Sequence, residues 1–308
     1  MKKKIIYNIL FTLISVIIIA NSQLHAQPGA LDKSFGTDGK AITLISGINN
    51  ELYKITIQKD NKIVAASVNH IGFKNDPLVV RYLENGIIDS SFGINGYSTI
   101  NDGLFSIDCC IAIQDDGKIL VGGTTNSNEV IIYRFMPDGD LDNSFGSKGV
   151  TINNLGGETG ARDIAILPDG KILVGGSFYA FKTENFKDAP FAARFNADGS
   201  LDSSFGKSGR CIVDSGGNAQ CIITSMVVGK DGRIILAGDN AQGTSSSTLI
   251  FVAAITAEGK TDKSFNQNGY TYTNISWDGD GKRFFELIGS GESRQCSVVH
   301  LFLINTVV

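Results

Sequence analysis

The stretch Leu141-Asp142-Asn143-Ser144-Phe145-Gly146 decides the fold, because close copies of it recur along the chain. The other copies begin at Leu31, Ile88, Leu201 and Thr261, and the last of them has lost its Leu and its Gly. The Phe of each copy follows the previous one by 53 to 60 residues. A fixed period of this length is typical of repeat architectures, in which each repeat is one supersecondary unit. The shared acidic and aromatic positions are Asp32, Phe35, Asp89, Phe92, Asp142, Phe145, Asp202, Phe205, Asp262 and Phe265.

Two further landmarks divide each repeat. Asp116-Gly117-Lys118 lies between two apolar runs, and this pattern predicts a β-hairpin because Gly supplies the positive φ that the turn needs. Later in the repeat an Arg stands next to an aromatic residue, as in Arg134-Phe135. The Asp-Gly landmark recurs as Asp60-Asn61-Lys62, Asp169-Gly170-Lys171 and Asp231-Gly232-Arg233, and the arginine recurs as Arg81 and Arg194 but is Ile255 in the fourth copy.

The landmarks predict four short strands in each repeat. One strand follows the Phe-Gly turn, two flank the Asp-Gly turn, and one carries the arginine. The central strands are apolar nearly throughout, which is typical of sheets covered on both faces. Four-stranded sheets that stack face to face are propeller blades. We therefore expect an all-β protein, a β-propeller or a propeller fragment, with four-stranded antiparallel blades; residues 27–275 would hold about four full blades and the start of a fifth.

These motifs resemble the delta-60 repeat, a β-propeller-like module of bacterial secreted proteins. The resemblance covers about Leu31 to Tyr272 and rests on five ordered copies. It implies a propeller fold and an extracellular setting. It implies no established activity.

The N-terminus predicts export. Three lysines follow Met1, an apolar run is densest from Ile9 to Ala20, and a small residue ends the segment at Ala26. This is the pattern of a signal peptide over residues 1–26, and its core is shorter than the ~20 apolar residues of a membrane span. We expect a secreted, periplasmic or cell-surface protein without a membrane span after cleavage, with an uncleaved anchor as the alternative.

The last residues, 276–308, depart from the repeat. They contain the single Trp and Cys296, and they end in an apolar run. One interpretation is a closing strand that pairs with the first blade. The other is out-of-frame translation of a longer gene.

The repeated side chains have a structural and a functional interpretation. An Asp before a tight turn accepts hydrogen bonds from the residues that follow it, and Phe can fill the space between blades. Five equivalent ligand or metal positions are the functional alternative. The arginines could likewise pair with the repeated aspartates, or form a ring that attracts an anion. We favour the structural role for both sets.

The sequence contains no motif for nucleophilic catalysis, metal binding or nucleic-acid binding. His70 and His300 are the only histidines after residue 26, and no nucleophile motif accompanies them, so we assign no catalytic residue. No cluster of His and Cys suggests a metal, and we expect no cofactor. A formal net charge of −4 without a basic stripe argues against a nucleic-acid partner. Paired carboxylates stay open, because their pairing is spatial.

Two local features predict a disulfide and a segment that could bind a ligand. Cys211 and Cys221 flank Ser215-Gly216-Gly217, so they could face each other across a hairpin and form a disulfide. Phe178, Tyr179, Phe181 and Phe186 lie in one variable segment, where exposed aromatic side chains would suit sugar or protein recognition. These aromatics could equally fold back onto the blade.

Three functions are consistent with this pattern. The first is a secreted binding or scaffold module whose partner is an extracellular glycan or protein. The second is a truncated piece of a larger propeller without activity of its own. The third is a glycan-active enzyme that uses two carboxylates about 5–10 Å apart in a cleft lined by aromatic residues.

Overall fold

The computed structural model describes residues 29–45, 49–71, 74–179, 188–214, 220–241 and 248–274. Within these ranges the chain forms sixteen β-strands and no helix. The predicted signal peptide (1–26), the segment 276–308 and Cys296 lie outside the described residues.

The strands form four antiparallel blades in chain order. The first two blades are joined by one residue pair between β3 and β5, Asn75 with Phe105. The first blade contains β1 (Asn49–Ile57), β2 (Ile63–Ile71), β3 (Lys74–Tyr82) and β4 (Tyr97–Thr99). The second contains β5 (Phe105–Ile113), β6 (Ile119–Thr125), β7 (Val130–Phe135) and β8 (Val150–Asn153). The third contains β9 (Glu158–Ile166), β10 (Ile172–Tyr179), β11 (Ala189–Phe195) and β12 (Arg210–Ile212). The fourth contains β13 (Gln220–Val228), β14 (Ile234–Ala241), β15 (Thr248–Ile255) and β16 (Tyr270–Asn274).

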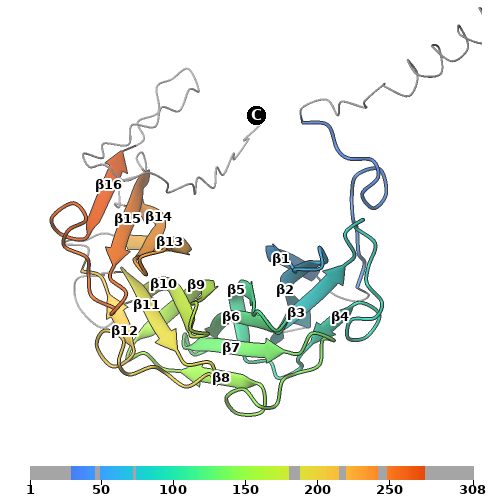
Figure 1. The fold of residues 1–308 in the computed structure, drawn as a ribbon, viewed down its shortest axis with the longest axis horizontal. Helices are drawn as coiled ribbons and strands as arrows, with labels where there is room; N and C mark the ends of the chain where they lie inside the picture. The colour runs from blue at the N-terminus through green and yellow to red at the C-terminus, as the bar shows by residue number, and fades with distance from the viewer. Residues whose placement is uncertain are drawn as a thin grey trace, which may run out of the picture.

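The blades stand side by side in an open arc (Figure 1). The first strand of each blade, β1, β5, β9 or β13, lies toward the inside of the arc, and the fourth strand lies on the outside. Neighbouring inner strands are in contact, β5 with β1 and β9, and β9 with β13. The predicted all-β propeller-like architecture with four-stranded antiparallel blades is confirmed.

Alternation of strand direction gives the arc two faces. The Asp-Gly turns join first to second strands, and the Leu-Asp-x-Ser-Phe-Gly segments, which we call corners, join third to fourth strands. Both kinds of connection therefore lie at the same end of the strands, on what we call the turn face. The remaining connections lie on the opposite face, the loop face.

The blades are offset from the sequence repeats by one strand. The strand after each corner pairs with the arginine-bearing strand before that corner, as β12 pairs with β11, so it completes a sheet and does not begin the next one. The corner with Phe265 thus completes the fourth blade, whereas the sequence predicted that it starts a fifth. The corner with Phe35 lies ahead of the first blade.

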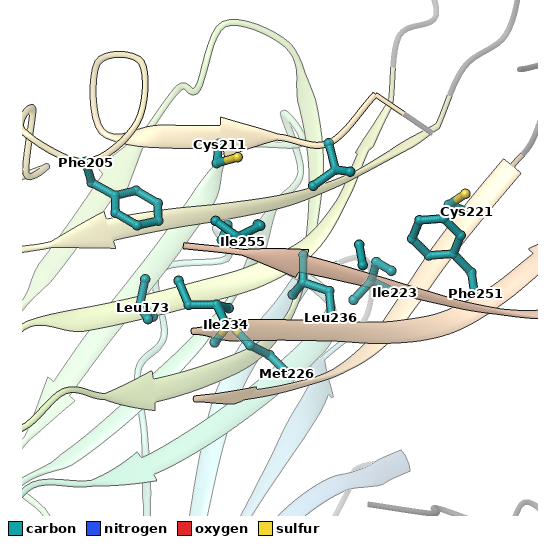
Figure 2. Close-up of a cluster of buried hydrophobic side chains, with 13 residues drawn as sticks. Leu173, Phe205, Cys211, Cys221, Ile223, Met226, Ile234, Leu236, Phe251 and Ile255 are labelled. Carbon is teal, nitrogen blue, oxygen red and sulfur yellow. The ribbon is translucent and has the colours of Figure 1, made fainter. Parts of the chain in front are cut away.

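Apolar side chains fill each of the three interfaces between blades. The interface of the third and fourth blades contains Leu173 and Phe205 from one side and Met226, Leu236 and Phe251 from the other. Figure 2 shows these side chains between the two sheets. Equivalent clusters join the first blade to the second and the second to the third. The second and third blades have a neighbouring blade on both faces, which explains the near-continuous apolar sequence of their central strands.

The predicted disulfide is absent. Cys211 and Cys221 are both buried and are not joined by a disulfide, and burial raises the pKa of Cys211 to about 11. They lie in different blades, on β12 and β13, and Figure 2 shows them apart. The prediction was wrong because β12 and β13 are not partners in one sheet: β12 pairs with β11 and β13 pairs with β14.

Candidate functional site

Each corner is closed by its aspartate and its serine. Asp142 Oδ1 accepts hydrogen bonds from the backbone N–H of Ser144 at 3.0 Å and from its hydroxyl at 2.6 Å. The backbone N–H of Phe145 donates to the Asp142 carbonyl at 3.0 Å. One aspartate therefore fixes the three residues that follow it, as expected for Asp before a tight turn. The same side-chain bonds occur at Asp32, Asp89, Asp202 and Asp262.

We call the corners with Phe92, Phe145 and Phe205 the inner corners, because each lies between two described blades. An arginine joins each inner corner to the next blade. Arg134 Nε donates to Asp142 Oδ2 at 2.8 Å, and its Nη1 donates to the Ala197 carbonyl of the third blade at 2.6 Å. The guanidinium carbon lies 4.5 Å from the centroid of the Phe145 ring, within range of a cation–π interaction. We call this set of contacts a staple. Equivalent staples are built by Arg81 and Arg194. The predicted pairing of arginine with aspartate is thus present. Each of the three guanidinium groups forms an ion pair with a carboxylate of its own corner.

The staples keep their aspartates ionised. Burial by itself would raise the pKa of Asp142, but the hydrogen bonds from Ser144 and the charge of Arg134 lower it to about 2. Asp89 is subject to the same opposing effects, and its pKa is also about 2. Asp202 also accepts a hydrogen bond from Lys171, at 2.8 Å, and its pKa is lowered further still.

The fourth corner obtains its cation from the Asp-Gly turn before β14. Ile255 replaces the arginine, and Arg233 stands where the other Asp-Gly turns carry a lysine. Arg233 Nε lies 2.9 Å from Asp262 Oδ2. The lysines of the other copies, Lys62, Lys118 and Lys171, lie 2.8–3.4 Å from the corresponding oxygen. Arg233 therefore makes the ion pair that a lysine makes in the other copies, and Asp262 has one cationic partner among the described residues where Asp89, Asp142 and Asp202 each have two.

The Phe of an inner corner fills space that a glycine of the next blade leaves. A Cβ added to Gly199 would lie 2.8 Å from Phe145 Cζ, and Gly199 has a φ of +90°. Phe92, Phe145 and Phe205 are fully buried between blades. Phe35 and Phe265, at the ends of the arc, are only half-buried. The repeated Phe positions are therefore interface residues wherever two described blades meet.

The aromatic segment is only partly described. Phe178 and Tyr179 are the last residues of β10 and are half-buried. Phe178 packs against the cluster between the second and third blades, and its ring occupies the space beside Gly157. Of the two interpretations, folding back onto the blade thus applies to Phe178. Phe181 and Phe186 lie outside the described residues.

A cavity of about 540 Å³ lies on the turn face between the first and second blades. The Asp60 turn and the Asp116 turn form its two sides. Lys59 Nζ lies 2.9 Å from Asp115 Oδ1 and so connects the two turns, and this lysine lowers the pKa of Asp115. We call this space the turn-face cavity. Its lining further includes Gln58, Lys62, Arg81, Ser91, Gln114 and Asp138.

Two glutamines distinguish this cavity from the equivalent positions in the later blades. Gln58 Oε1 and Gln114 Oε1 are buried without a hydrogen-bond partner. Each Gln directly follows the first strand of its blade, where the third and fourth blades have Leu167 and Gly229. A buried acceptor without a partner costs about 1–3 kcal/mol, so the site favours a donor. The two glutamines were not predicted from the sequence, although they recur at the same position in two of the four repeats.

A buried carboxylate lies on the loop face. Asp76 is fully buried, and its Oδ1 accepts a hydrogen bond from the backbone N–H of Gly103 at 2.7 Å. Burial raises the pKa of this carboxyl group, and the neighbouring charge of Asp102 adds to the increase. Asp102 in turn accepts a hydrogen bond from the Tyr133 hydroxyl at 2.8 Å. The arrangement ties the connection between β4 and β5 to β3 and β7, the third strands of the first two blades.

The described ranges contain neither a metal-binding cluster nor a membrane-spanning helix. In that part of the chain, no group of three or more His, Cys, Asp or Glu side chains is arranged to hold a metal ion. No helix there is long and apolar enough to cross a membrane.

A protein-family comparison matches three segments of the chain. The family is described as a domain of unknown function (DUF5122) β-propeller, and the matches cover residues 58–92, 114–145 and 167–205. Each match begins directly after the first strand of a blade and ends at the corner Phe. These three segments are similar to the DUF5122 β-propeller domain. The finer resemblance to the delta-60 repeat stays a prediction.

The solved structures that match this chain have low sequence identity to it. An endo-arabinase from Bacteroides thetaiotaomicron is 11% identical with a TM-score of 0.42, over 78% of this chain and 82% of that one. A mannose phosphorylase from Leishmania mexicana is 10% identical with a TM-score of 0.40, over 75% of this chain and 69% of that one. The search of curated proteins gave no significant match.

Proposed function

We propose that this chain is a binding and scaffold module that holds a hydroxyl-rich ligand, an extracellular glycan, in the turn-face cavity. The observation that carries the proposal is the pair of buried, unpartnered amide oxygens of Gln58 and Gln114 at a cavity of about 540 Å³. This volume is within the range of small-ligand sites, about 300–1,000 Å³. Once the two glutamine side chains turn toward the cavity, sugar hydroxyl groups supply the donors that their oxygens lack, and these hydroxyl groups can also accept from Lys59.

Binding is favoured over cleavage by the composition of this lining. The cavity has carboxylates at Asp60, Asp115, Asp116 and Asp138, but its lining includes no aromatic side chain. An enzyme with two carboxylates in an aromatic cleft, as the sequence left open, has no support from this cavity. The staples support a scaffold role, because they hold the turns of adjacent blades in fixed positions.

The proposed setting is outside the cytoplasm, at the cell surface, in the periplasm or in the medium. It draws on the signal-like pattern of residues 1–26, and processing after Ala26 would leave every described residue in the mature chain.

The test is glycan binding by the protein from residue 27 onward, first on an array of neutral and acidic oligosaccharides and then by calorimetry. Gln114→Leu, which copies Leu167 of the third blade, and Lys59→Ala should each weaken binding at least tenfold. Lys230→Ala is the matched control, because Lys230 occupies the position of Lys59 in the fourth blade. Absence of any glycan ligand, or binding that is indifferent to both cavity variants, would contradict the proposal.

A further inference from the structure

The corner at residues 31–40 docks on the first blade as the inner corners dock on theirs. The Gly36 N–H donates to the Asn85 carbonyl at 2.7 Å, as the Gly93 N–H donates to the Asp138 carbonyl at 2.7 Å. A Cβ added to Gly86 would lie 2.8 Å from Phe35 Cζ, which is the distance found between Gly199 and Phe145. This corner therefore presents the edge of a blade to the first blade.

The staple at this corner is incomplete. Asp32 makes the usual bonds with Ser34, but it is exposed, and no arginine in the described part of the chain pairs with it. In the complete staples, the carbonyl that accepts from arginine lies two residues before the turn glycine. Glu84 holds that position before Gly86. An incoming guanidinium group would thus meet the Asp32 carboxylate, the Phe35 ring and the Glu84 carbonyl.

Apolar side chains of the first blade are exposed where their counterparts are buried. Ile55 is 65% exposed. At the same register in the other blades, Ile111, Ile164 and Met226 are 9%, 6% and 8% exposed. Each of these three belongs to the apolar cluster shared with the preceding blade. A neighbouring sheet on this side of the first blade would bury Ile55 in the same way.

A groove of about 540 Å³ lies between this corner and the first blade. Phe35, Ala41 and Thr43 line one wall, and Leu52 and Ile55 contribute to the other. Exposed Ile42 and Leu44 lie on the same segment, which follows its corner as the fourth strands follow theirs. Residues 41–45 are paired with no strand in the described part of the chain, so their backbone is free for antiparallel addition of a strand. We call this space the end groove.

We propose that the end groove binds a three-stranded antiparallel segment of the same repeat class, whose third strand carries Arg next to an aromatic residue. Residues 40–43 then become the fourth strand of the composite blade. The arginine completes the staple at Asp32, and the apolar strands cover Ile55. The described part of a second copy does not fit this role, because each of the four described blades already has a fourth strand and the fourth has Ile255 in place of the arginine. The inference is independent of any ligand in the turn-face cavity.

The experiment titrates the protein from residue 27 onward against a fluorescent synthetic segment of residues 158–200, which contains β9, β10 and β11, and follows anisotropy. We expect saturable binding. The matched probe carries Arg194→Ile, the residue found in the fourth blade, and should bind at least tenfold more weakly. Asp32→Asn in the acceptor should produce a similar loss while its thermal melting stays unchanged, because Asp32 is exposed.

Equal binding of the two probes would overturn the proposal, and so would the absence of binding. The protein ending at residue 274 provides a further comparison. If the probe binds only to that shorter protein, the chain's own C-terminal residues occupy the groove, and the proposal of a separate repeat segment is wrong.

Discussion

A single carboxylate in each corner serves two purposes. One oxygen of Asp142 shapes the corner through Ser144, and the other binds Arg134, which reaches the next blade. Local geometry and contact between blades therefore depend on the same side chain. The fourth copy shows that the carboxylate stays when its cation comes from the Asp-Gly turn alone, since Arg233 pairs with Asp262 although Ile255 stands in place of the arginine.

This exchange predicts a compensating pair of substitutions. Arg134→Ile should lower the free energy of unfolding by about 3 kcal/mol, because it leaves Asp142 buried without its main partner. Adding Lys118→Arg reproduces the arrangement of the fourth blade and should restore part of the loss. Urea denaturation of the two variants and the parent measures both effects. A double variant no more stable than Arg134→Ile would show that position 118 cannot supply the cation.

At the scale of elements, the corner and the turn glycine of the following blade form a matched pair. Gly199 lies against the Phe145 ring, so its lack of a side chain serves both the backbone and the interface. Gly170 has a similar φ of +81°, but the nearest atom to a Cβ there would be 4.0 Å away. The two positions separate the cost of backbone conformation from the cost of displacing a neighbouring blade.

Alanine substitutions at these two glycines should therefore differ. Gly170→Ala should cost about 1–2 kcal/mol, which is the price of a left-handed conformation for an L-residue. Gly199→Ala should cost about 1–3 kcal/mol more, because its Cβ also forces the Phe145 ring to move. Thermal and urea denaturation of both variants tests the difference. Equal losses would mean that the ring moves without cost.

The same elements show what the sequence could predict. The strands, the turns and the pairing of Arg134 with Asp142 follow from residues that recur at fixed positions in each repeat. The offset between blade and repeat does not, because the strand after a corner can pair on either side without any change in its sequence pattern. The disulfide prediction failed for the same reason, since it assumed that Cys211 and Cys221 share a sheet. The Gln58–Gln114 cavity depends on two blades meeting, which one repeat does not reveal.

For the whole molecule, stability resides in the three interfaces as much as in the blades. Each interface combines an apolar cluster with a staple whose aspartate has a lowered pKa. Because the staples are alike, one solution condition acts on all of them together. Acid is such a condition, since it removes the charge on which the staples depend.

Stability should accordingly fall in acid in a defined window. A carboxyl group whose pKa is lowered on folding stabilises the protein above its ordinary pKa, near 4, and this contribution is lost as the pH falls through its folded value, about 2 for Asp89 and Asp142. We expect a loss of about 1–2 kcal/mol for each staple between pH 4 and pH 2. Urea midpoints across this range test it. Asp142→Asn should be less stable at pH 7 but less sensitive to acid, and an acid profile identical to that of the parent would contradict this assignment.

The offset between sheet and repeat also bears on how such a chain can change its length. Any stretch of gene that runs from one point in a repeat to the equivalent point in the next encodes the four strands of one blade, in permuted order. Recombination between repeats therefore inserts or deletes a whole blade while every hydrogen-bond ladder stays intact. Each inserted copy brings both a corner for its successor and a glycine for its predecessor, so its two new interfaces are complementary from the start.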